Sequence, residues 1–135
     1  MPLFTWDSSY SVGVQDMDNE HIKLFGIINS LYDAMKSGKS KEVMEDVFKQ
    51  LVDYTEVHFS DEEKLMSQHN YPGINEQMAQ HKLFVDKVEE NYKKYREGAI
   101  LISIDIMNFL KDWLVNHIQI IDKKYAEFFN RIGIK

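Results

Sequence analysis

Apolar residues recur every three or four positions along most of the chain, and this spacing constrains the fold more than any other feature. The period marks one apolar face of an α-helix, whereas a half-buried strand alternates with a period of two, a pattern that no stretch shows. Glycine-containing and proline-containing breaks interrupt the pattern at Ser37-Gly38, at Asn70-Tyr71-Pro72-Gly73 and at Glu97-Gly98. The predicted helices therefore span about residues 18–36, 40–68, 75–96 and 103–132.

Four amphipathic helices joined by short turns predict an all-α fold. We expect an up-down-up-down four-helix bundle that residues 1–135 form as a single domain. Before the first helix, residues 1–17 form an N-terminal arm, and its bulky residues indicate that it packs against the bundle: Phe4, Trp6, Tyr10, Val12 and Val14. The apolar faces of the helices are predicted to include Ile22, Phe25, Val43, Leu51, Met78, Phe84, Trp113 and Leu114.

The composition excludes several kinds of site and partner. The chain of 135 residues has no cysteine, which rules out disulfides, iron–sulfur clusters, thiolate metal sites and a cysteine nucleophile. Its 22 acidic and 16 basic residues give a net charge of −6, and an acidic surface disfavours nucleic acid and anionic lipid as partners. The start of the chain lacks the pattern of a signal peptide, and no apolar stretch is long enough to span a bilayer. We therefore expect a cytoplasmic monomer that binds neither nucleic acid nor membranes.

Four of the five histidines lie on or beside the predicted apolar faces. His21, His58, His81 and His117 each come from a different helix, at comparable depths if neighbouring helices are antiparallel. A single histidine on such a face is usually a hydrogen-bonded core residue. Four that converge from four helices match the way in which bundles build interior metal sites, and neutral imidazole is the commonest metal ligand.

Two carboxylates strengthen the prediction of a metal site. Glu62 follows His58 by four residues, so the two side chains lie only ~40° apart around a helix. Asp122 follows His117 by five residues, about 140° apart in an α-helix, so spacing alone does not select it. Carboxylates and imidazoles without sulfur favour iron or manganese over structural zinc. The Glu-x-x-His pattern of ferritin-like di-iron bundles does not occur at any histidine.

Taken in order, these residues resemble the bacterial hemerythrins over essentially the whole chain. The similarity runs through Trp6, Tyr10-Ser-Val-Gly-Val14, Met17-Asp18-Asn-Glu-His21, His58-Phe-Ser-Asp-Glu62-Glu63, Tyr71-Pro72-Gly73, His81 and His117-Ile-Gln-Ile-Ile-Asp122-Lys-Lys-Tyr125. The resemblance implies two iron ions bridged by an oxo or hydroxo group and by Glu62 and Asp122. It further implies that His21 and His58 bind the iron with an open position, where dioxygen attaches, and that His81 and His117 bind the other iron.

One position departs from the family pattern. The resemblance leads us to expect a histidine four residues before His81, but that residue is Gln77. A glutamine offers its amide oxygen as a neutral ligand that is weaker than imidazole. Three alternatives stay open: Gln77 binds the second iron, water takes its place, or that iron is held less firmly. The fifth histidine, His69, lies seven residues beyond Glu62, roughly 10 Å further along the helix, and is expected to be a solvated helix-end residue.

The function expected from the resemblance is reversible dioxygen binding for storage, delivery or buffering, without enzymatic turnover. Phe25, Trp113, Leu114 and Ile118 are predicted to form a dry pocket wall around the open iron. Three alternatives remain. The site could belong to a di-iron enzyme that reduces nitric oxide or peroxide or oxidises ferrous iron, to an oxygen or redox sensor, or to a metal-free structural bundle. A sensor usually needs an attached signalling domain, and the buried ionisable residues disfavour a metal-free bundle.

Overall fold

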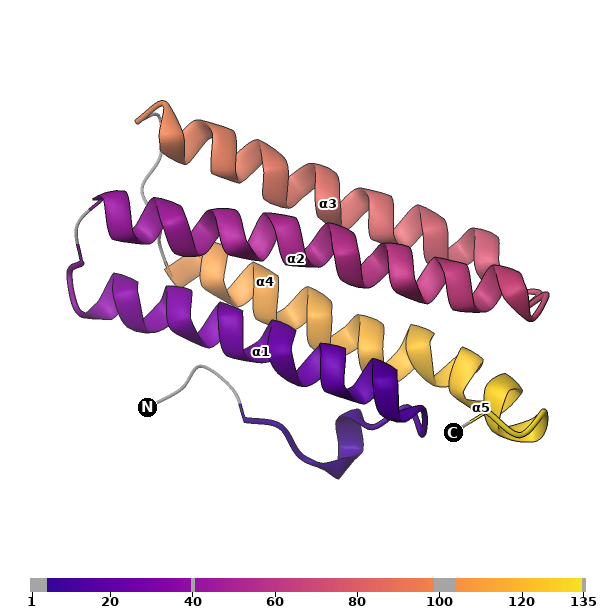
Figure 1. Ribbon diagram of the computed structural model, residues 1–135. Helices are drawn as coiled ribbons and strands as arrows, with labels where there is room; N and C mark the ends of the chain where they lie inside the picture. The colour runs from indigo at the N-terminus through magenta and orange to yellow at the C-terminus, as the bar shows by residue number, and fades with distance from the viewer. Residues whose placement is uncertain (1–4, 40, 99–103, 135) are drawn as a thin grey trace.

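The computed structural model describes residues 5–39, 41–98 and 104–134, and these contain helices and no strand. The four helical segments 15–36, 41–68, 74–96 and 104–131 are each antiparallel to the next along the chain (Figure 1), which confirms the predicted all-α, up-down-up-down bundle. The elements are η1 (Ser8–Tyr10), α1 (Gln15–Lys36), α2 (Lys41–Gln68), α3 (Ile74–Arg96), α4 (Ile104–Asn116), η2 (His117–Asp122) and α5 (Lys123–Arg131). In the part of the chain that the structure describes, no helix is both long and apolar enough to cross a membrane.

The turns end the helices where the sequence predicted breaks. Gly38 adopts a positive φ of 64° after α1, and the backbone N–H of Lys39 donates to the carbonyl of Ala34. Asn70 likewise adopts a positive φ of 56° after α2, and the backbone N–H of Tyr71 donates to the carbonyl of Met66. Both are left-handed helix caps that satisfy carbonyls at the helix end.

The fourth helix differs from the prediction of one continuous α-helix over residues 103–132. Its described part begins at Ile104, because residue 103 lies outside the described residues. Between α4 and α5, the six residues of η2 form a π-helix, whose hydrogen bonds span five residues instead of four. Such wide turns are rare and occur frequently at functional sites.

Three residues that were predicted to be buried are exposed, which corrects the apolar faces. Ile22, Val43 and Met78 are 43%, 46% and 45% exposed. In each helix a direct neighbour takes the buried position instead: His21, Met44 and Gln77. The inward face is therefore displaced by one residue at these three positions, and in α1 and α3 the residue that turns inward is polar.

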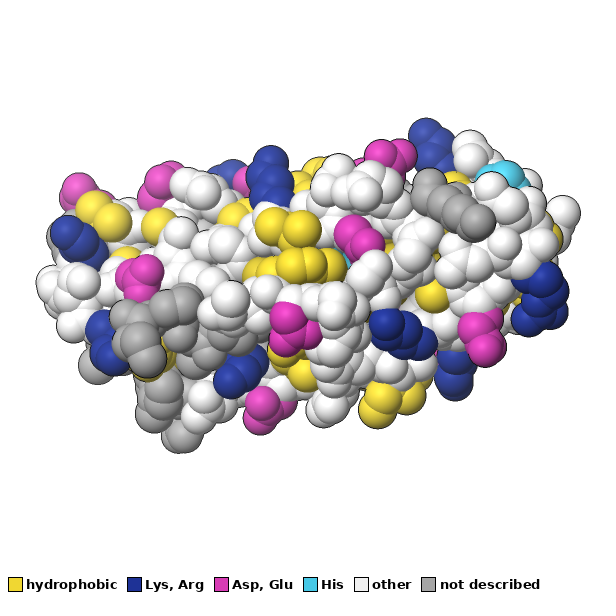
Figure 2. Space-filling model, turned by 90° about the horizontal axis from the view of Figure 1, so that it is seen from below, with side chains coloured by type: hydrophobic (Ala, Val, Ile, Leu, Met, Phe, Trp, Pro, Cys, Tyr) yellow, Lys and Arg dark blue, Asp and Glu magenta, His cyan; other side chains and the backbone are white. Residues whose placement is uncertain are grey.

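The described part of the N-terminal arm packs against the bundle, as predicted, whereas Phe4 lies outside the described residues. Val12 and Val14 are buried, and the carboxylate of Asp18 at the start of α1 accepts hydrogen bonds from the Val12 N–H (2.8 Å) and the Ser11 hydroxyl (2.6 Å). Lys123 donates to the Ser11 carbonyl, which ties the arm to α5. On the face seen from below, hydrophobic side chains gather near the middle, among charged side chains of both signs (Figure 2).

Candidate metal centre

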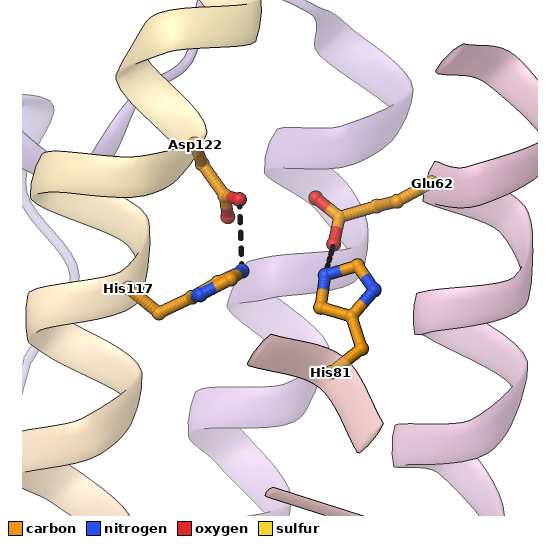
Figure 3. Close-up of side chains that lie close together, drawn as sticks. All are labelled: Glu62, His81, His117 and Asp122. Atoms are coloured by element: carbon orange, nitrogen blue, oxygen red, sulfur yellow. Dashed lines mark ion pairs between the residues drawn. The ribbon is translucent and has the colours of Figure 1, made fainter. Parts of the chain in front are cut away.

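The four predicted histidines meet inside the bundle. His21 comes from α1, His58 from α2, His81 from α3 and His117 from η2, and none is more than 3% exposed. Figure 3 shows His81 and His117 on opposite sides of the site, with the carboxylates of Glu62 and Asp122 directed toward them. The structure thus brings together, in one buried cluster, side chains that lie far apart in the sequence.

The π-helix explains how Asp122 joins the cluster. Five residues of an α-helix would place Asp122 about 140° away from His117. In a π-helix, residues five apart are one turn apart and face the same side. The Asp122 carboxylate consequently lies 3.1 Å from the Nε2 atom of His117. His58 and Glu62 achieve the same pairing by the ordinary four-residue spacing of α2, also at 3.1 Å.

Each carboxylate contacts imidazoles on both sides of the cluster. Glu62 Oε1 lies 3.1 Å from His58 Nε2 and 3.4 Å from His81 Nε2. Asp122 Oδ2 lies 3.4 Å from His21 Nε2, while its Oδ1 lies 3.1 Å from His117 Nε2. Two overlapping donor groups result, one of His21, His58 and Glu62 and the other of Glu62, His81, His117 and Asp122. This arrangement suits two cations bridged by two carboxylates.

The donor atoms fit bound metal because the protein itself leaves them unpaired. Buried polar atoms normally have hydrogen-bond partners. Here the close N···O approaches between imidazoles and carboxylates lack hydrogen-bond geometry. Seven buried donor atoms consequently have no hydrogen-bond partner among the described residues: the Nε2 atoms of His21, His58, His81 and His117, and Glu62 Oε1, Asp122 Oδ2 and Gln77 Oε1. Cation coordination would satisfy these lone pairs together. The set contains nitrogen and oxygen but no sulfur, which suits iron or manganese.

The opposite charges of His58 and Glu62 shift each other's pKa, and each shift favours the charged form. Burial alone would lower the pKa of His58, but the negative charge of Glu62 and the hydrogen bond to Glu20 raise it to about 10. Burial alone would raise the pKa of Glu62, but the charge of His58 and the nearby imidazoles hold this pKa well below its ordinary value. Glu62 is therefore ionised, which is the form that binds a cation.

Two further carboxylates orient the histidines, and the sequence analysis missed both. Glu20 Oε1 lies 2.9 Å from His58 Nδ1, and Glu63 Oε2 lies 2.8 Å from His81 Nδ1. A ring nitrogen that donates outward turns the other nitrogen, Nε2, toward the metal and makes it more basic. Each of these glutamates directly adjoins a predicted ligand in sequence, and that adjacency was the only available signal.

Tyr125 is a third side chain that supports the cluster. Its hydroxyl donates to Glu62 Oε2 at 2.5 Å, and burial raises the pKa of the phenol well above its ordinary value, so the phenol stays a donor. This bond leaves Glu62 Oε1 to face His58 and His81. The sequence resemblance included Tyr125 but assigned it no role.

Gln77 lies inside the cluster and is 1% exposed. Its Nε2 donates to Asp122 Oδ1 at 2.9 Å, while its Oε1 has no partner among the described residues. His69, in contrast, lies outside both donor groups, and its ring packs edge-on against Phe129 with a centroid separation of 5.9 Å.

Aromatic side chains pack against the imidazoles of the cluster. Trp113 stacks on His117, with centroids 4.6 Å apart, and on Phe84, at 4.2 Å. It thus contacts the half of the cluster that contains His81 and His117. The other predicted pocket residues, Phe25, Leu114 and Ile118, are buried.

Comparisons with known proteins agree with this geometry. Residues 12–129 match the family model described as the hemerythrin HHE cation binding domain. The chain is 32% identical over 127 residues to the bacteriohemerythrin of Methylococcus capsulatus, covering 93% of this chain and 96% of that protein. It is 34% identical over 122 residues to a hemerythrin-like protein of Naegleria gruberi, with 90% of each chain covered.

Solved structures give the same result. A crystal structure of wild-type hemerythrin superposes with a TM-score of 0.88 at 30% identity, covering 93% of this chain and 96% of the other. A leucine-to-tyrosine mutant of hemerythrin gives a TM-score of 0.90 at 30% identity, covering 94% and 97%.

Proposed function

The chain belongs to the hemerythrin family, and on this premise we propose that its buried cluster holds two iron ions and binds dioxygen reversibly. The observation that carries the proposal is the set of buried, unpaired donor atoms that converge from all four helices of the bundle. Bound iron would supply the electrons and the coordination position that dioxygen needs.

Each side chain has a distinct part in this proposal. His21 and His58 would hold one iron, and His81 and His117 would hold the other. Glu62 and Asp122 would serve both, since each contacts imidazoles of both groups. Glu20 and Glu63 keep the Nε2 atoms of His58 and His81 directed inward.

The surroundings of the cluster favour reversible binding over turnover. Water and protons promote irreversible oxidation of an iron–dioxygen site, so a carrier excludes them. Phe25, Leu114 and Ile118 are at most 2% exposed, and we propose that they form an apolar wall beside His21 and His58. The Tyr125 hydroxyl donates to Glu62, which makes its proton unavailable to a bound ligand.

A second candidate function is a di-iron enzyme that reduces nitric oxide or peroxide. The observation that favours it is Gln77, which stands where an imidazole is expected and which donates its amide hydrogen to Asp122. A more labile second iron would suit turnover better than oxygen carriage.

Visible absorption spectra test the proposed function. Iron-loaded, reduced protein should be nearly colourless, gain a charge-transfer band on exposure to air, and lose the band when flushed with argon. A His58→Ala variant, which lacks one donor, should not show the cycle. Immediate, irreversible oxidation of the parent protein would favour the enzyme, and one tightly bound zinc without iron would exclude a di-iron centre.

A further inference from the structure

The two halves of the cluster offer nearly the same protein donors. One half has the Nε2 atoms of His21 and His58, and the other has those of His81 and His117. Glu62 and Asp122 each lie within 3.4 Å of an imidazole in both halves. Two imidazoles with carboxylate oxygen are the set that non-haem iron(II) sites use where positions stay open for exogenous ligands. The imidazoles and carboxylates therefore do not make one half closed and the other open.

Gln77 is a further donor, and it stands in the half of His81. The two residues are four positions apart on α3, so their side chains share a face of the helix. Its amide nitrogen donates to Asp122 Oδ1, the same oxygen that lies 3.1 Å from His117 Nε2. An ionised carboxylate only accepts hydrogen bonds, so the nitrogen of the amide, and not its oxygen, must face Asp122.

The hydrogen bond to Asp122 limits what Gln77 can do for a metal. The amide is planar, so fixing its nitrogen against Asp122 also fixes the direction of Oε1, which is buried and has no partner among the described residues. A carboxamide oxygen is neutral and suits hard cations such as magnesium, calcium and manganese, whereas imidazole suits iron. A small ligand with a better donor atom can displace such an oxygen or bind beside it. The unpaired Oε1 can then accept a hydrogen bond from a protonated ligand.

A groove between α2 and α3 borders this half of the cluster. It has a volume of about 490 Å³ and is lined by residues that include Phe59, Glu63, Met78, His81 and Val85. His81 thus lies between the groove and the other donors of the cluster. The groove is larger than a small anion or a diatomic molecule, and the His81 side chain forms part of its wall.

We infer that the half formed by His81, His117 and Gln77 is a second binding position for a small exogenous ligand. The metal pair therefore takes two such ligands, one on each half. The ligand class is a small monoanion such as azide or a diatomic molecule such as nitric oxide, which occupies one coordination position. This inference rests on the proposed di-iron centre and specifies how many exogenous ligands that centre binds.

Azide titration of the diferric protein tests the inference, after metal analysis has established two irons per chain. The parent protein should bind two azides per iron pair. Gln77→His supplies an imidazole at the same position and should reduce the number to one. Gln77→Ala should still bind two azides, and it should bind the second azide more tightly, because no amide competes for that position. The matched control is Gln50→His, at an exposed glutamine of α2, and it should still bind two.

Infrared spectra of isotopically labelled azide give a second readout that needs no variant. The parent should show two azide stretching bands that saturate at different concentrations, and Gln77→His should show one. A single azide and a single band in the parent would overturn the inference while leaving the proposed function intact if dioxygen still binds reversibly. A parent protein without two irons would overturn both.

Discussion

The two ends of the bundle are equally buried but are filled with opposite chemistry. At one end Leu31, Phe48, Leu51 and Val88 are at most 1% exposed and belong to the hydrophobic core. At the other end the same helices bury four imidazoles, two carboxylates and an amide. Van der Waals packing completes the first end, whereas the protein alone leaves donor atoms unpaired at the second.

The difference teaches that stability and function are separated along the helix axes. Burial of apolar surface stabilises the fold without any ligand. Unpaired buried polar groups destabilise it by about 1–3 kcal/mol each. We therefore expect the apolar end to hold the bundle together and the site end to depend on its metals.

The largest expected effect comes from a cavity at the apolar end. Phe48→Ala should lower the free energy of unfolding by ~3–5 kcal/mol, because Phe48 is fully buried and contacts the rings of Tyr92 and Tyr95. Denaturant titrations should give the same loss for iron-loaded and metal-free protein, since the residue is remote from the donors. Val57→Ala, at a side chain that is 53% exposed, is the control and should change stability by less than ~0.5 kcal/mol. A markedly greater loss in the iron-loaded form would show that the two ends are coupled.

Removal of the metals should have the next largest effect on stability, and it should act at the end of the bundle that contains the candidate metal centre. A ligand that binds only the native state stabilises it by ~4 kcal/mol at a thousand times its dissociation constant. Thermal melts should therefore separate the iron-loaded and metal-free proteins. Hydrogen exchange should locate the difference: amide protection should fall near His58 and Asp122 and stay nearly unchanged near Leu31 and Phe48. Equal melting midpoints would contradict the dependence of the site end on metal.

The smallest expected effect comes from the glutamates that orient the histidines. Glu20→Ala and Glu63→Ala should each weaken metal binding by roughly 10–100-fold, the usual effect of removing such a partner. Glu20→Gln and Glu63→Gln should retain part of the affinity, because an amide oxygen still accepts the hydrogen bond without the charge. Competition with a chelator measures these changes. Glu90→Gln, at an exposed residue that pairs with Lys94, should leave metal binding unchanged, and an equal loss there would mean that only net charge matters.

The sequence alone predicted the bundle and the convergence of the histidines, for physical reasons that are easy to name. The period of three to four residues fixes the helix type, and short breaks force neighbouring helices to be antiparallel. One histidine on each helix then points toward a shared interior. The same pattern failed at Ile22 and Met78, because an apolar stripe does not reveal that a neighbouring polar residue, His21 or Gln77, occupies the inward position. It also failed at Val43, where the apolar neighbour Met44 is buried instead.

Contacts across helices were beyond prediction from spacing. The hydrogen bonds from His58 Nδ1 to Glu20 and from His81 Nδ1 to Glu63 depend on how two helices are rotated against each other. A run of acidic residues such as Asp61-Glu62-Glu63 looks solvated until that rotation is known. Only the packing of α2 against α1 and α3 separates buried Glu62 from its half-exposed neighbour Glu63.

The π-helix of η2 matters for anyone who would transplant this site into a designed scaffold. Idealised bundles are built from straight α-helices with regular hydrogen bonding. Copying His117 and Asp122 at their natural spacing onto such a rod would direct the aspartate about 140° away from the histidine. A designer must either import the wide turn or move the aspartate one residue closer, to the four-residue spacing that His58 and Glu62 already use. The transferable unit is thus a spacing together with its helix type, and the residue pattern alone does not specify it.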